Sequence, residues 1–106
     1  MTVVLIPGQW KRYVSNARKS VIYNALLNRR CLTIFCYVGG DPVATYSIGQ
    51  HAYEGAPEPY FSVVRPVDFD TRQLIKAESK LLLDMLWKDI DFDELTNLLG
   101  RPPEEW

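Results

Sequence analysis

The sequence has few of the residues from which catalytic and metal sites are usually built. Its 106 residues include one histidine, His51, and two cysteines, Cys31 and Cys36. A zinc site needs several His or Cys ligands at short spacings, and acid–base catalysis needs a second group that orients the base. We therefore expect no catalytic residue, no metal and no cofactor, and we do not expect an enzyme.

One alternative to that expectation is open. His51 lies in the turn-rich stretch 49–60 (GQHAYEGAPEPY) together with Glu54 and Glu58. The alternative hypothesis is therefore a small enzyme in which His51 acts as a general base and one of these carboxylates orients it. A surface histidine without a chemical role explains the same residues, and it predicts that His51 is dispensable.

Long apolar runs and export signals are also missing. No run approaches the ~18–20 residues that a membrane span requires, so we expect no membrane partner. The start, MTVVLIPGQWKR, has no basic residue before its short apolar run and is a poor secretory signal. Cys31 and Cys36 fall on opposite faces of a predicted strand, which argues against a mutual disulfide. Two free thiols suit a reducing compartment, so we expect a cytoplasmic location.

Acidic residues are absent from residues 1–40. The basic residues of this stretch are Lys11, Arg12, Arg18, Lys19, Arg29 and Arg30. Residues 41–106 hold all 13 acids and six bases, so the two stretches carry formal charges of +6 and −7 although the whole chain carries −1. This asymmetry indicates either an anionic partner for the first stretch or mutual neutralisation of the two stretches within one fold.

What is present is typical of one globular domain, residues 1–106. The hydrophobic share of 47% and the charged share of 24% are ordinary for such a domain. The stretch 31–48 (CLTIFCYVGGDPVATYSI) predicts a β-hairpin, because two runs rich in β-branched and aromatic residues flank the turn sequence GGDP. A four-residue loop places Phe35 opposite Tyr46 on one face, with Ile34 on the other, and a two-residue loop keeps the same two faces. We expect Phe35 and Tyr46 to be a buried pair.

The other elements follow from hydrophobic period and turn residues. We expect a strand at 2–6, a helix at 9–28, a strand at 60–65, a helix from the N-cap Asp70 to about residue 88, and a short helix at 92–99. The order β-α-β-β-β-α-α predicts an α+β fold, a small antiparallel sheet of three to four strands with helices on one face.

Two of the expected helices have assigned faces. The first would carry a basic face of Lys11, Arg12, Arg18 and Lys19 opposite an apolar stripe that begins at Trp10. The second would bury Leu74, Ile75, Leu81, Leu82, Met85 and Leu86. Trp10 and Trp87 are expected in the core.

The C-terminal stretch FDELTNLLGR (residues 92–101) and the helix before it resemble the first two helices of helix-turn-helix or Myb-like DNA-binding units. In those units a third helix reads the major groove, but here it would have to begin at Pro102 and the printed chain ends at Trp106. We interpret the stretch as an ordinary helical hairpin, with Trp106 available to anchor a partner.

These observations favour a small binding or regulatory protein that acts by occupying the surface of a protein partner. Adaptors and the small inhibitors encoded by phages or mobile elements are proteins of this kind. The expected partner-binding residues are Lys11, Arg12, Arg18, Lys19, Arg29, Arg30 and Trp106. The alternative is a nucleic-acid-binding protein that uses the basic first helix.

Overall fold

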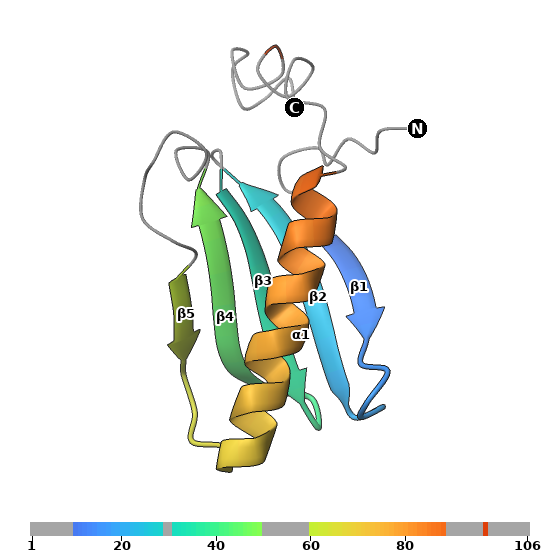
Figure 1. The fold of residues 1–106 in the computed structure, drawn as a ribbon, viewed down its shortest axis with the longest axis vertical. Helices are drawn as coiled ribbons and strands as arrows, with labels where there is room; N and C mark the ends of the chain where they lie inside the picture. Colours follow the sequence, from blue (N-terminus) through green and yellow to red (C-terminus); the bar gives the residue numbers. More distant parts are fainter. Residues whose placement is uncertain (1–9, 29–30, 50–59, 89–96, 98–106) are drawn as a thin grey trace.

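The computed structural model describes residues 10–28, 31–49 and 60–88, together with Asn97. The elements are β1 (Trp10–Val14), β2 (Val21–Asn28), β3 (Cys31–Val38), β4 (Asp41–Gly49), β5 (Tyr60–Val63) and α1 (Phe69–Lys88). The five strands form one antiparallel sheet in the order β1-β2-β3-β4-β5, and α1 crosses one face of it (Figure 1). The predicted α+β class is therefore confirmed, although the sheet has more strands than expected.

The helix expected at 9–28 is wrong, because this stretch forms β1 and β2. Burial along both strands alternates with a period of two, as in a sheet with one covered face. The polar residues between the strands make the turn, where the Ser15 Oγ accepts hydrogen bonds from the amides of Ala17 and Arg18. The predicted element order fails at this first helix. The expected strand at 2–6 and almost all of the helix at 92–99 lie outside the described residues.

The core lies between the sheet and α1. Strand residues of one parity face the helix, and α1 packs mainly on β3 and β4. The largest fully buried side chains include Trp87, Leu83 and Ile75 from α1 and Leu27, Leu32 and Ile34 from the strands. Trp87 therefore lies in the core as predicted.

The β3–β4 hairpin contradicts the predicted face assignment. The turn is Gly39-Gly40, with φ angles of 59° and 89° that suit a two-residue hairpin turn. The register then shifts between Cys36 and Tyr37, so one extra residue of β4 is accommodated as a bulge. Beyond the bulge, Ile34 pairs with Tyr46, whereas Phe35 pairs with Thr45 on the face away from α1.

The position of the helix α1 agrees with the prediction, but its N-cap and some of its buried residues differ. Its N-cap is Asp68 rather than Asp70, since the Asp68 carboxylate accepts hydrogen bonds from the amide and the hydroxyl of Thr71. Ile75 is buried as expected, but Leu81 and Met85 are exposed. The buried side chains of α1 are Thr71, Ile75, Ser79, Leu82, Leu83, Leu86 and Trp87.

Candidate functional site

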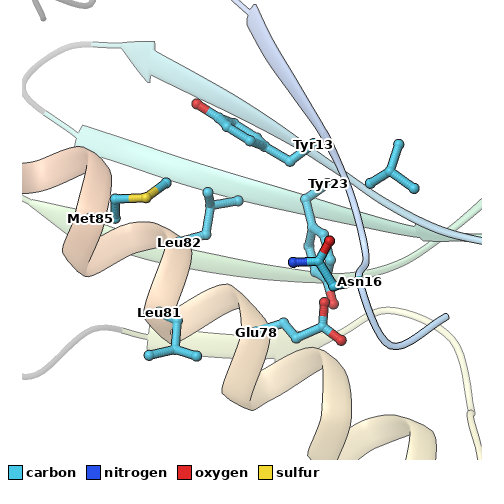
Figure 2. A pocket seen from close by; sticks show the side chains of 8 residues that line it. Tyr13, Asn16, Tyr23, Glu78, Leu81, Leu82 and Met85 are labelled. Carbon is cyan, nitrogen blue, oxygen red and sulfur yellow. The ribbon is translucent and has the colours of Figure 1, made fainter. Parts of the chain in front are cut away.

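A groove lies between the start of the sheet and α1, on the helix-covered face. It has a volume of about 260 Å³. Its lining residues are Tyr13, Val14, Asn16, Tyr23, Glu78, Leu81, Leu82 and Met85, which come from β1, the β1–β2 turn, β2 and α1 (Figure 2). The groove forms because α1 packs mainly on β3 and β4, which leaves the helix side of β1 only partly covered.

The rim of the groove is apolar and open to solvent. Val14, Leu81 and Met85 are 55%, 70% and 49% exposed. On α1, Leu81 and Met85 lie one helical turn apart, and both line the groove together with the buried Leu82. Exposed apolar side chains gathered around one hollow are typical of an interaction site.

The floor of the groove is polar. The Tyr23 side chain is 2% exposed, and its hydroxyl has no hydrogen-bond partner although the Glu78 carboxylate lies nearby (Figure 2). Burial, followed by the charge that Cys36 carries once it is ionised and by the charge of Glu78, raises the pKa of Tyr23, so the phenol is protonated at neutral pH. Glu78 acts mainly through its charge, because the contact falls short of hydrogen-bond geometry.

The β1–β2 turn is tied to α1 at two points beside the groove. The Ser15 hydroxyl donates to Glu78 Oε1 at 2.8 Å. The Arg18 guanidinium donates to the Thr71 hydroxyl, and that hydroxyl donates to Asp68 Oδ1 at 2.7 Å. These bonds fix one end of the groove and hold the Glu78 carboxylate in place.

β1 is an edge strand of the described sheet, and the register fixes which of its backbone groups are open. The amide of Ser15 donates to the carbonyl of Val21 at 2.9 Å, so this pair is hydrogen-bonded. In an antiparallel ladder such pairs alternate with pairs whose N–H and C=O groups point away from each other. Trp10, Arg12 and Val14 therefore direct their backbone groups towards the side of β1 that no described strand pairs with, which we call the open edge.

The predicted basic face does not exist as one surface. Lys11 and Arg12 are neighbours on a strand, so their side chains lie on opposite faces of the sheet. Arg18 is held by Thr71, and Lys19 is exposed in the turn. Lys11, Arg12 and Lys19 form no ion pair with any described residue. Arg29, Arg30 and Trp106 lie outside the described residues, as do His51, Glu54 and Glu58.

The sheet face away from α1 is aromatic at the β1 end. Trp10, predicted to be buried, is 53% exposed, and its ring lies 5.1 Å from that of Phe35. A second hollow of about 250 Å³ lies on this face beside Arg12, Asn24 and Tyr37. No described helix covers this face (Figure 1).

The groove was not predicted from the sequence, although one signal for it is present. The apolar positions of α1 include both 81–83 and 85–87, which is more than one side of a helix can bury against one sheet. The excess identifies a second apolar side, but it does not show which residues are left exposed.

Neither known proteins nor a metal or membrane site among the described residues gives further information about the groove. No family model, no curated protein and no solved structure matches the chain. Within the residues that the structure describes, no group of three or more His, Cys, Asp or Glu side chains is placed to hold a metal ion. The described helical residues contain no segment long and apolar enough to cross a membrane.

Proposed function

We propose that the chain is a small non-enzymatic binding protein, of the adaptor or inhibitor kind, that acts by occupying the surface of a protein partner through the groove between β1 and α1. The exposed apolar rim formed by Val14, Leu81 and Met85 carries this proposal. Burying such side chains against a partner contributes about 25 cal/mol per Å² of apolar area, before the cost of association.

The test compares two charge substitutions on the same helix. Leu81→Asp places a carboxylate on the groove rim, and it should leave the fold intact because Leu81 is exposed. Phe69→Asp is the matched control, because Phe69 is 72% exposed on α1 and does not line the groove. The parent and both variants are immobilised as full chains, and proteins captured from a lysate of the source organism are compared by quantitative mass spectrometry.

The expected result is a protein that the parent and the Phe69→Asp variant retain and that the Leu81→Asp variant loses by at least tenfold. Circular dichroism at matched concentration checks that both variants are folded. If every captured protein is retained equally by the two variants, the groove is not the binding surface and the proposal fails.

A second candidate function, binding of single-stranded nucleic acid, is supported by the aromatic face of the sheet. Trp10 and Phe35 offer rings for base stacking, and Arg12 lies beside them on the same face. Fluorescein-labelled dT and rU oligonucleotides test it by anisotropy at low and moderate salt. Binding that weakens linearly in log–log terms with salt and is lost on Arg12→Glu would support this candidate, and an absence of binding at low salt would reject it.

A further inference from the structure

We infer that the partner contributes an extended acidic segment that pairs with the open edge of β1 as a sixth strand and places apolar side chains in the groove. This inference rests on the proposed function and specifies how the partner is recognised. Its chemistry is that of a peptide in which apolar residues alternate with polar or acidic ones.

The backbone of β1 supplies the first requirement. Arg12 and Val14 point their N–H and C=O groups away from β2, as deduced from the Ser15–Val21 hydrogen bond. An exposed row of such groups is a template for an added strand. Addition of a strand at a sheet edge is a recurrent mode of peptide recognition, in which main-chain bonds give affinity and alternate side chains give specificity.

The groove supplies the second requirement. Side chains of an added strand point alternately to the two faces of the sheet. Those on the helix side would lie next to Tyr13 and beside the exposed Leu81 and Met85 of α1. The buried Tyr23 side chain lines the same hollow.

The charge of β1 selects an acidic segment. Lys11 and Arg12 have no ion-pair partner among the described residues, and β1 contains no acidic side chain. On the open face, the residue of the added strand directly opposite Arg12 would lie within reach of its guanidinium, and opposite charges at such positions are stabilising. The same face would bring the added strand over the exposed Trp10.

The same charges argue against a second copy of this chain as the occupant. A symmetric antiparallel pairing of two β1 edges centred on Arg12 places Arg12 opposite its symmetry mate, and like charges directly opposite are destabilising. Centring the pair on Lys11 has the same effect. The basic edge therefore opposes self-pairing and favours a segment of opposite charge.

The experiment selects ligands for the full chain from a display library of random linear peptides. Enriched peptides should alternate apolar and polar residues and carry Asp or Glu among the polar ones. Synthetic versions are then N-methylated at single amides. Methylation at amides of one parity should weaken binding at least tenfold, because those amides face β1, whereas methylation at the other parity should have little effect. Bound peptide should slow amide hydrogen exchange at Arg12 and Val14 by at least tenfold.

Matched variants test the charge and separate this inference from the proposed function. Arg12→Glu should shift the selection to Lys- or Arg-containing peptides, while Lys19→Glu, an exposed charge in the adjacent turn, should leave it unchanged. Peptides that are lost on Leu81→Asp but tolerate methylation at every amide would overturn strand addition and leave groove binding standing. The inference is also overturned if the selection enriches no peptide, or if the enriched peptides contain no acidic residues.

Discussion

Raising the pH should destabilise the fold through the buried thiol of Cys36. This side chain is 1% exposed on the helix side of β3. Burial, followed by the charge of Glu78, raises its pKa to about 12, from 9.0 for an exposed thiol. The unfolded chain therefore releases this proton first, and between these two values the folded state holds more protons than the unfolded state. Stability must fall as the pH rises through that window.

The magnitude follows from the width of the window. One pH unit between the two pKa values corresponds to about 1.4 kcal/mol, so Cys36 should lower the free energy of unfolding by about 1.4 kcal/mol by pH 10. That is a substantial part of the 5–15 kcal/mol that is typical of a folded domain. The raised pKa of Tyr23 acts in the same direction above pH 10.

Urea unfolding between pH 7 and pH 10 measures this loss. The comparison uses Cys36→Ala in a Cys31→Ser background, because Cys31 is a second free thiol and is exposed. The stability gap between the Cys36 protein and its alanine variant should narrow by about 1.4 kcal/mol across the range. If the free energies of unfolding of the two proteins change with pH in parallel, the reasoning is refuted. It is also refuted if the Cys36 thiol of the folded protein reacts with a disulfide reagent as fast as that of the protein unfolded in urea.

Three further predictions concern local structure. The Thr71 hydroxyl and amide lower the pKa of Asp68, so the stability from this N-cap is present above pH 3.8 and is lost as the pH falls through the lowered pKa. In the Asp68→Asn variant, the melting temperature should therefore depend less on pH below pH 4 than it does in the parent. A double-mutant cycle of Ser15→Ala with Glu78→Ala should give a coupling of about 0.5–3 kcal/mol in urea unfolding, and additivity would contradict the bond. Ile34→Ala should cost about 2–5 kcal/mol and Phe35→Ala clearly less, since only Ile34 faces α1; the reverse ranking would contradict the register.

The sequence predicted best where one period dominates over a long run. The helix α1 has an apolar repeat over five turns, and Ile75, Leu82 and Leu86 are buried as expected. The prediction failed at Leu81 and Met85, which are exposed, and Leu74 is only partly buried, because a single sheet covers only one side of the helix. Which apolar side chains stay exposed depends on where the helix crosses the sheet, and the helical period alone does not contain that information.

The stretch 9–28 failed for a different reason. It combines two short strands and a turn, and over such short lengths the apolar residues fit a helical stripe and an alternating pattern about equally well. Ala25, Leu26 and Leu27 favour a helix by intrinsic propensity, yet they lie in β2, where pairing with both β1 and β3 decides the conformation. Non-local hydrogen bonding overrode the local preference.

A single residue in β4 decides which face the aromatic side chains occupy. Because side chains alternate along a strand, the extra residue of the bulge near Val43 reverses the parity of everything that follows it. Without it, Phe35 would share the covered face with Tyr46; with it, Phe35 lies on the open face and supports the ring of Trp10 at the edge of the sheet. Phe35 lies beside Trp10 because of the registers of β1 with β2 and of β2 with β3, whereas the bulge sets only how β4 pairs with β3. Deleting Val43 should either force the hairpin turn to change length or move Phe35 towards α1. If the turn changes length, Phe35 stays beside Trp10 and the edge at Arg12 is kept. If Phe35 moves towards α1 instead, the ring of Trp10 loses its support, and strand addition at Arg12 should weaken.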